Sequence, residues 1–300
     1  MGVRSSNTDR DGSKNKGFRS QSKNILLDGH LQKFFTSRLD GGIVGPNHQN
    51  LLTASGGTET ESGGFKYHAF TTAGADTFVV TSGQLDNASV LVIGAGGSGA
   101  GGWGGSGGGG GGILWADGNY PLTPGTYPLT VGDGNTHSSQ NVAGSDGEAS
   151  VFNGVTPGTA PAGEGGKYGG PTNNAGGDAG STSPTPVWTG YTGGEGGAPP
   201  VSPGGGGGGA GGNGSPAGEG GVGVRIPTFT DYGTPGPGGT GGYFSGGGGT
   251  AGESVGGYGG GTSTPGRPAD LENTGGGGGS DSDGYPNTSS KGIIIIKYPV

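Results

Sequence analysis

The clearest pattern along the chain is an alternation of apolar and polar positions between residues 65 and 155. Such alternation is typical of half-buried strands, and turn residues separate the segments. The pattern predicts an all-β fold, a small β framework over residues 65–155. The strands are expected at Tyr67–Thr71, Asp76–Thr81, Ser89–Ile93, Ile113–Trp115, Tyr120–Leu122, Thr126–Val131 and Ser150–Phe152.

Two apolar runs are continuous and bracket the most unusual part of the chain. Ser89–Ile93 (SVLVI) precedes a glycine-rich region, and Lys291–Tyr298 (KGIIIIKY) follows it. Four isoleucines in a row suit a strand that is buried on both faces. We therefore expect both runs in one sheet, with a strand at residues 291–299 closing the framework and the glycine-rich region inserted between them.

Glycine dominates that inserted region. Of the 85 glycines, 72 lie after residue 93, in blocks such as Gly107–Gly112 and Gly204–Gly209. Ordering a glycine costs roughly 0.5–1 kcal/mol more than ordering alanine, so the blocks are either flexible linkers or use a structure that only glycine permits. Left-handed helices with three residues per turn have no internal hydrogen bonds, and they can bond to one another when no side chain separates them. Because aromatic residues recur between the blocks, we predict an ordered polyglycine II bundle with display loops over residues 156–290.

Residues 1–64 differ from the rest in charge. Residues 1–40 hold eight basic and four acidic residues, whereas the remainder holds six basic and eighteen acidic ones. The spacing of Leu27, Leu31, Phe34 and Phe35 suits a helical turn or two. We expect an extended docking arm that contacts other proteins through these four residues and ends in a linker. Nucleic-acid binding is the alternative for a basic arm, but no nucleic-acid-binding module follows it, so we expect no nucleic acid.

Composition excludes several classes of protein. The chain has no cysteine, which excludes disulfide frameworks and cysteine metal clusters. No apolar run approaches the roughly 20 residues of a membrane-spanning helix, and the N-terminus lacks the apolar core of a signal peptide. Collagen is excluded because glycine has no three-residue period and the 20 prolines are too few.

Formal motifs for cofactors and catalysis occur in contexts that do not support them. Gly94, Gly96 and Gly99 follow a strand as in a dinucleotide fingerprint, but more glycine stands where that motif needs a helix. Ser106 matches a nucleophile elbow without histidine or acid partners. The sequence DSDG at residues 281–284 lacks the bidentate acid of a calcium loop. We therefore expect no enzyme activity, no cofactor and no metal.

Aromatic residues between the glycine blocks are the candidate binding residues. Aromatic side chains give recognition loops a large contact area at a low entropy cost. The candidates for contact with a receptor are Trp188, Tyr191, Phe229, Tyr232, Tyr243, Phe244 and Tyr258. The alternative for each is that it packs under a loop or against the side of the bundle.

The order FTTAGADTFVVTSG, VLVIGAGGSGAGG, LTPGTYPLTVGDG, glycine blocks and GIIIIKYP resembles the glycine-rich domain of many bacteriophage virion proteins, over about residues 65–300. The resemblance implies a small jelly-roll-like β-sandwich that carries a polyglycine II bundle. It also implies a virion protein similar to tail-fibre adhesins, which contact the host surface through loops at the bundle tip.

Several expectations about partners follow from that resemblance. Other virion proteins would bind the N-terminal arm, and the receptor would be a glycan or an outer-membrane protein. A homotrimer is expected by analogy with fibres. One alternative is a capsid decoration or neck component whose bundle acts as a rigid spacer. Another is a depolymerase of surface glycans, which would need paired carboxylates in a cleft.

Overall fold

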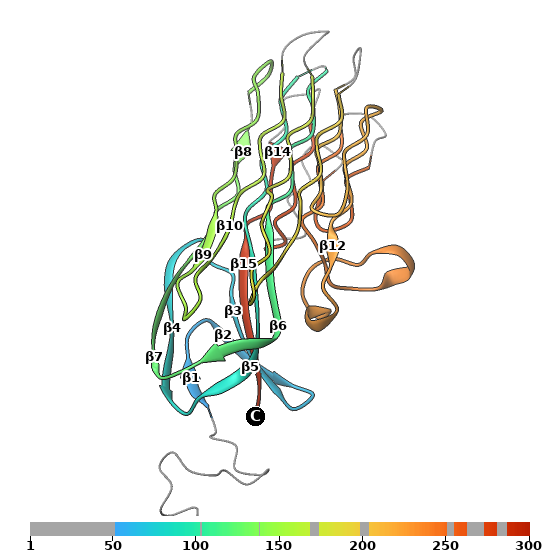
Figure 1. Cartoon of the computed structure of the whole chain (residues 1–300). Helices are drawn as coiled ribbons and strands as arrows, with labels where there is room; N and C mark the ends of the chain where they lie inside the picture. The colour runs from blue at the N-terminus through green and yellow to red at the C-terminus, as the bar shows by residue number, and fades with distance from the viewer. Residues whose placement is uncertain are drawn as a thin grey trace, which may run out of the picture. The chain divides into compact units, whose positions relative to one another are not determined.

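A computed structural model gives the arrangement of residues 52–102, 104–137, 139–168, 174–198, 204–250, 255–262, 273–280 and 287–300. These residues are almost entirely β, with two antiparallel sheets at the base of a glycine-rich bundle (Figure 1). The predicted all-β class is therefore confirmed. The four predicted docking residues, Leu27, Leu31, Phe34 and Phe35, lie outside the described residues.

The first sheet has five strands in the order β1–β4–β7–β9–β10. Every neighbouring pair is antiparallel. The strands are β1 Thr53–Ser55, β4 Gly74–Ser82, β7 Gly125–Val131, β9 Ser150–Phe152 and β10 Gly158–Ala160.

The second sheet has six strands in the order β11–β6–β5–β15–β3–β2. The strands are β11 Thr189–Gly190, β6 Ile113–Leu122, β5 Leu85–Ile93, β15 Ile293–Pro299, β3 Phe65–Phe70 and β2 Thr58–Ser62. Two further strand pairs join β12 Val224–Arg225 to β13 Tyr243–Phe244 and β8 Thr136–His137 to β14 Asn287–Thr288. Short 3-10 turns occupy η2 Pro227–Phe229 and η3 Pro237–Gly239.

The closing strand β15 lies where the isoleucine run predicts it. Ile295 pairs with Leu91 of β5 on one side and with Ala69 of β3 on the other. Ile294 and Ile296 enter the core between the two sheets, whereas Ile293 and Ile295 enter a second apolar cluster on the opposite face. Both faces of β15 are covered, which explains why its sequence does not alternate.

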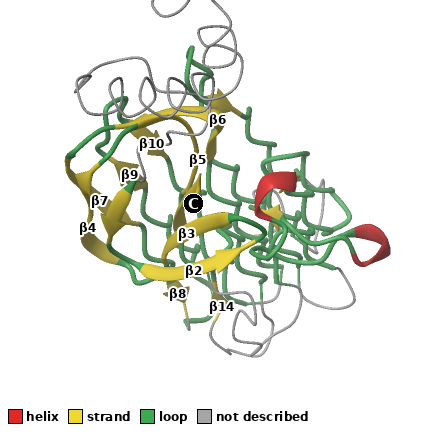
Figure 2. Cartoon of the chain, turned by 90° about the horizontal axis from the view of Figure 1, so that it is seen from below, coloured by secondary structure: helices red, strands yellow, loops and turns green. Residues whose placement is uncertain are grey.

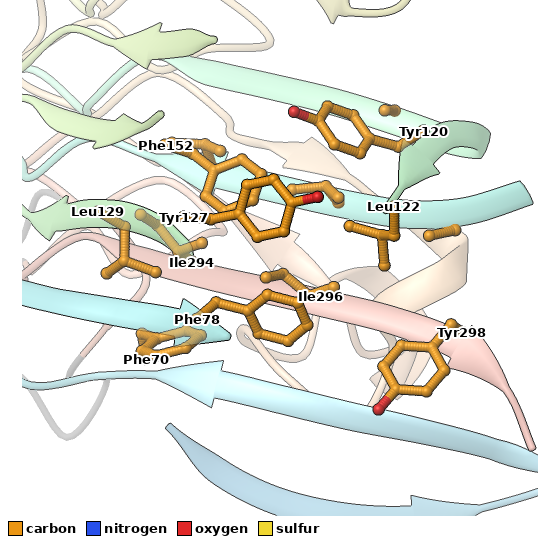
Figure 3. Close-up of a cluster of buried hydrophobic side chains, with 14 of the residues drawn as sticks. Phe70, Phe78, Tyr120, Leu122, Tyr127, Leu129, Phe152, Ile294, Ile296 and Tyr298 are labelled. Atoms are coloured by element: carbon orange, nitrogen blue, oxygen red, sulfur yellow. The ribbon is translucent and has the colours of Figure 1, made fainter. Parts of the chain in front are cut away.

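The core between the sheets is rich in aromatic side chains. Figure 3 shows Ile294 and Ile296 near Phe78 and Tyr127, with Phe152 next to Tyr127. The rings of Phe78 and Tyr127 lie 6.1 Å apart between centroids, and those of Tyr127 and Phe152 are equally close. Each fully buried apolar side chain of this size contributes roughly 1.5–3 kcal/mol to folding, so this core anchors the base of the molecule.

The boundaries of the elements differ from the sequence expectation in several places. β1 and β2 form within residues 53–64, where a linker was expected, because alternating Thr, Glu and Ser carry no apolar signal. Ile113–Leu122 forms one strand with register shifts, where two short strands were expected. Glycine helices also begin at Gly94 and not at residue 156, since the first glycine block belongs to the bundle.

Hydrogen bonds within the bundle repeat every three residues. The N–H groups of Gly94, Gly97 and Ala100 donate to the antiparallel segment 106–112, at 2.9–3.0 Å. The next residues along, Ala95 and Ser98, donate instead to the segment 142–148. Successive residues thus bond in different directions to different neighbours, which is the behaviour of a threefold polyglycine II helix without internal hydrogen bonds.

The segment Ser106–Gly112, hereafter the central glycine helix, lies at the centre of this packing. Within the described chain it exchanges backbone hydrogen bonds with six neighbouring segments, namely 94–100, 161–164, 177–180, 205–208, 248 and 275–278. Three of these neighbours accept from its N–H groups and three donate to its carbonyl groups. Figure 2 shows the glycine segments nearly end-on, as a lattice beside the sandwich. The core of the bundle therefore consists of backbone.

Close approach explains why glycine is required in this core. A Cβ atom added to Gly108 or Gly207 would lie within 3.0 Å of a neighbouring backbone carbonyl, a distance that real Cβ atoms essentially never show. Any other residue would push the helices apart and break their mutual hydrogen bonds. Each of those bonds contributes about 0.5–1.5 kcal/mol net, so many together can offset the entropy that ordered glycine costs.

Candidate functional site

Three of the seven aromatic candidates are buried. Trp188 is 2% exposed and packs in the sandwich core, where its ring lies 5.2 Å from that of Tyr120 and its Nε1–H donates to the Thr156 carbonyl at 3.2 Å. Phe229 and Phe244 are 1% and 0% exposed and cover the outer face of the six-stranded sheet. Their burial removes these three side chains from any surface that a receptor could contact.

The segment Val224–Phe244, hereafter the covering segment, explains two of these burials. It leaves the bundle through β12 and returns through β13 (Figure 1). Its apolar residues lie over Ile293, Ile295 and Leu91, which would otherwise expose the outer face of the sheet to water. Removing such apolar surface from water is the main favourable term in folding, so this segment is primarily a cover.

A polar contact ties the covering segment to the sheet. Thr228 Oγ1 donates to Asp117 Oδ1 at 2.9 Å, and Lys297 Nζ donates to the Thr228 carbonyl oxygen at 3.3 Å. Ser89 Oγ lies 3.5 Å from the same carboxylate oxygen. These groups satisfy one another's hydrogen-bonding capacity, and together they hold the covering segment against the sheet.

The remaining four candidates lie in two places. Two are at the edge of the apolar cluster on the outer face of the six-stranded sheet, and two are near an exposed surface. Tyr191 and Tyr232 are half-buried against that cluster, and the rings of Tyr232 and Tyr67 lie 6.2 Å apart. Burial raises the pKa of Tyr191. Tyr243 is half-buried, and its ring lies 6.0 Å from that of Tyr258, which is 47% exposed.

Tyr243 and Tyr258 belong to an exposed apolar surface on the side of the bundle. Val222 and Val255 are 45% and 59% exposed. Their segments adjoin, since the Gly220 N–H donates to the Val255 carbonyl and the Gly223 N–H to that of Tyr258. We call Val222, Tyr243, Val255 and Tyr258 the flank patch. Clustered apolar exposure of this kind is typical of interaction surfaces.

The bundle end away from the sandwich presents a further aromatic residue that sequence reasoning did not select. Tyr168 Oη donates to Asn141 Oδ1, which joins two segments at this end. Asn141 has a φ of 59°, in the left-handed region that asparagine tolerates better than most residues. Nearby, Ser106 Oγ lies 2.6–2.7 Å from the carbonyl oxygens of Lys167 and Ala175. No spacing rule in the sequence brings Tyr168 and Asn141 together.

Acidic residues form a row across adjacent outer segments of the bundle. Asp146 accepts from the Gly165 N–H beside Glu164, and the Glu164 N–H donates to the Asp178 carbonyl. Asp178 Oδ1 accepts in turn from Gly196, next to Glu195. We call Asp146, Glu164, Asp178 and Glu195 the acidic row. Lys167 pairs with Glu164 at 3.1 Å, and the other three carboxylates give this face a negative potential.

The described residues show no grouping suited to a metal. Within them, no three histidine, cysteine, aspartate or glutamate side chains gather closely enough to hold an ion. In the same part of the chain, no helix has the length and apolar character needed to cross a membrane.

Comparison with known proteins identifies the fold family. A search of curated proteins found no match to this chain. The family model described as a glycine-rich domain matches residues 71–299. That range runs from the turn before β4 to the end of β15, and therefore includes the bundle and most of the sandwich. The chain belongs to the glycine-rich domain family.

Proposed function

We propose that this protein is a non-enzymatic structural component of a bacteriophage virion, and that it acts as a tail-fibre or tail-associated adhesin on the host cell surface. The observation that carries the proposal is the bundle whose core is backbone. Its six-neighbour packing gives a stiff projection that is rooted in a sandwich. Such a projection can hold binding residues away from its point of attachment.

The physical design of the bundle supports a display role. Glycine predominates in its interior, and the buried side chains there are small ones such as Ala95, Ser98 and Ala210. The segments that join one glycine helix to the next can therefore change without repacking a core of large side chains. Exposed aromatic residues on rigid supports are suited to recognition because little entropy is lost on binding. Tyr258 of the flank patch is the candidate that fits this role best, and the half-buried Tyr168 at the far end is a second one.

The remaining parts of the proposal concern assembly. Residues 1–51 would dock to other virion proteins through Leu27, Leu31, Phe34 and Phe35. The protein would form a homotrimer and lie on the exterior of the particle. Its receptor would be a surface glycan or an outer-membrane protein, and no nucleic acid would bind. These elements rest on the resemblance to phage virion proteins and on the charge difference between residues 1–40 and the remainder.

A second candidate function is a capsid decoration or neck component in which the bundle is a rigid spacer. The burial of Trp188, Phe229 and Phe244 favours it, because the candidate binding surface is smaller than the sequence predicts. A spacer needs a stiff bundle and a surface that repels neighbouring copies. The acidic row gives one face of the bundle a negative charge that serves this purpose.

A competition experiment separates the two functions. Purified full-length protein, added to host cells before the phage, should reduce adsorption if the protein is the adhesin. The double variant Val255→Ser/Tyr258→Ser should lose this effect, whereas Val155→Ser, also at an exposed valine, should keep it. Unchanged adsorption together with antibody labelling on the head would overturn the adhesin and favour the spacer. Release of sugars from host cells would instead indicate a depolymerase.

A further inference from the structure

The chain crosses from one sheet to the other directly after its first strand, β1. β1 belongs to the five-stranded sheet and β2 to the six-stranded sheet, with only Gly56 and Gly57 between them. Both glycines have positive φ values, of 122° and 64°, which other residues rarely adopt. We call Leu52–Ser62 the strand crossing. It connects residues 1–51 to the sandwich.

A buried histidine holds this strand crossing in place. His68 of β3 is 0% exposed. Its Nδ1 lies 2.8 Å from the Gly56 carbonyl oxygen, and its Nε2 lies 3.0 Å from Tyr298 Oη of β15. The neutral ring satisfies both contacts when Nδ1–H donates to Gly56 and Nε2 accepts from the Tyr298 hydroxyl. One side chain thus joins the crossing, β3 and the closing strand.

The surroundings of His68 are poorly suited to a positive charge. The ring of Phe78 from β4 meets it edge-on at 4.9 Å, and the ring of Tyr298 stacks at 5.6 Å. Protonation would place a donor on Nε2, opposite a hydroxyl that already donates to it. The Tyr298 hydroxyl would then have to turn and lose its acceptor.

Charged groups near His68 have opposite effects on its pKa. Glu59 Oε2 of β2 lies 3.5 Å from Nδ1 and favours the charged ring, but Glu59 Oε1 also pairs with Lys66 at 3.4 Å. Lys66 of β3 disfavours the charged ring. The pKa of Tyr298 is raised to about 12, mainly by burial and further by the negative charges of Glu59 and Glu61. Burial dominates at His68 as well and lowers its pKa below 6.5, despite the Gly56 carbonyl and Glu59.

We propose that His68 is an acid-sensitive latch for the strand crossing, and that its protonation releases residues 52–62 while the rest of the sandwich stays folded. The topology supports a local release. β1 and β2 are the edge strands of their sheets, every side chain of β2 is exposed, and the strand crossing contributes only Leu52 and Ala54 to the core. Edge elements with few buried contacts open at a lower free energy than central strands do.

The direction of the pH dependence follows from proton linkage. In the closed state His68 stays neutral. In the released state its pKa returns to the ordinary value near 6.5. The stabilisation of the closed state is therefore complete above pH 6.5 and decreases as the pH falls below it. Opening should rise about tenfold per pH unit between 6.5 and the lowered pKa of the closed state.

Hydrogen exchange on the full chain tests the latch. Peptides covering residues 52–62 and, as an internal control, β7 at residues 125–131 should be followed by mass spectrometry at pH 7.5, 6.5, 5.5 and 5.0, with correction for intrinsic exchange. We expect protection of 52–62 to fall below pH 6.5, by up to tenfold per unit until it levels off near the lowered pKa of the closed state, while β7 remains protected. Constant protection of 52–62, or equal loss in both peptides, would overturn the proposal.

Two variants identify the titrating group. In His68→Gln, protection of residues 52–62 should no longer depend on pH across this range. Glu59→Gln removes the carboxylate that favours the charged ring, so the opening of the crossing should continue to a lower pH than in the wild type. If His68→Gln does not fold, Glu59→Gln still decides the matter, provided that the series is extended down to the pH at which the wild-type profile levels off. A profile that levels off at the same pH in both proteins would count against the latch.

Discussion

The N–H of Gly207 donates a hydrogen bond of 2.8 Å to the carbonyl oxygen of Gly248, although the two glycines come from separate blocks. Neither residue has a side chain, so the contact that joins their helices is made by backbone alone. Similar contacts surround the central glycine helix. The bundle is therefore sensitive to any added carbon atom in its interior.

Substitution of an interior glycine should be strongly destabilising. In Gly207→Ala the new Cβ would meet the Gly108 carbonyl, and we expect a loss of about 1–3 kcal/mol or more, the usual cost of overpacking. Chemical denaturation monitored by circular dichroism measures it. Gly125→Ala is the matched control, because its added Cβ has no neighbour nearer than 3.9 Å. Equal stability of the two variants would contradict a backbone core.

The buried and exposed aromatic residues should behave differently when truncated. Trp188→Ala removes a ring that packs on Tyr120 and a hydrogen bond to Thr156, and should cost about 3–5 kcal/mol. Tyr258→Ala should change stability by less than about 0.5 kcal/mol because half of the side chain is exposed. Urea denaturation of the two variants compares them directly. A large loss in Tyr258→Ala would mean that the flank patch is part of a structural contact.

Alkaline pH should destabilise the sandwich through Tyr120. Burial is the main cause that raises the pKa of Tyr120 to about 12, from an ordinary value of 10. The fold therefore favours the neutral phenol, and this stabilisation is complete below pH 10 and decreases as the pH rises toward 12. Tyr120→Phe should weaken the pH dependence of the unfolding midpoint above pH 10.

The same variant has a cost at neutral pH. Tyr120 Oη donates to the Thr156 carbonyl and accepts from the Thr156 N–H, both at 3.0 Å. Its removal should lower stability by about 1–3 kcal/mol, because the Thr156 N–H loses this acceptor and the Thr156 carbonyl keeps only the Trp188 Nε1–H. Tyr258→Phe serves as the exposed control and should leave both properties unchanged. An identical alkaline profile in wild type and Tyr120→Phe would disprove this role for Tyr120.

Neutralising the acidic row should stabilise the protein at low ionic strength. Glu195→Gln removes one of its like charges, and the gain should be at most about 0.5 kcal/mol since the side chain is exposed. The gain should vanish near 1 M salt, where the screening length is about 3 Å. Glu164→Gln is the comparison, because it also removes the pair with Lys167, and its gain should be smaller. Thermal unfolding at two salt concentrations measures both.

Much of the fold could be predicted from local pattern. The run Ile293–Ile296 indicates a strand covered on both faces, and the structure places it between β5 and β3. β9 has the predicted bounds, and β4 and β7 differ by one or two residues at their ends. By contrast, β1 and β2 contain almost no apolar residues, so hydrophobic periodicity could not indicate them. Their pairing depends on neighbours elsewhere in the chain.

The candidate binding residues were less predictable. Tyrosine and tryptophan are favoured both in recognition surfaces and in cores, so residue type alone does not separate Trp188 from Tyr258. The separation depends on whether a sheet face lies beneath the segment. Ile293, Ile295 and Leu91 provide such a face for Phe229 and Phe244, but these residues are 49 or more positions away in the sequence.

Residue order alone was sufficient to identify an all-β protein, the closing role of the isoleucine strand and the need for a structure specific to glycine. These features depend on alternation, run length and the missing side chain, which are local properties. The tertiary structure decided which glycine segments became neighbours, which aromatic residues were buried and that His68 meets Gly56 and Tyr298. Those outcomes depend on contacts between distant segments, because packing, and not local preference, selects which surfaces are removed from water.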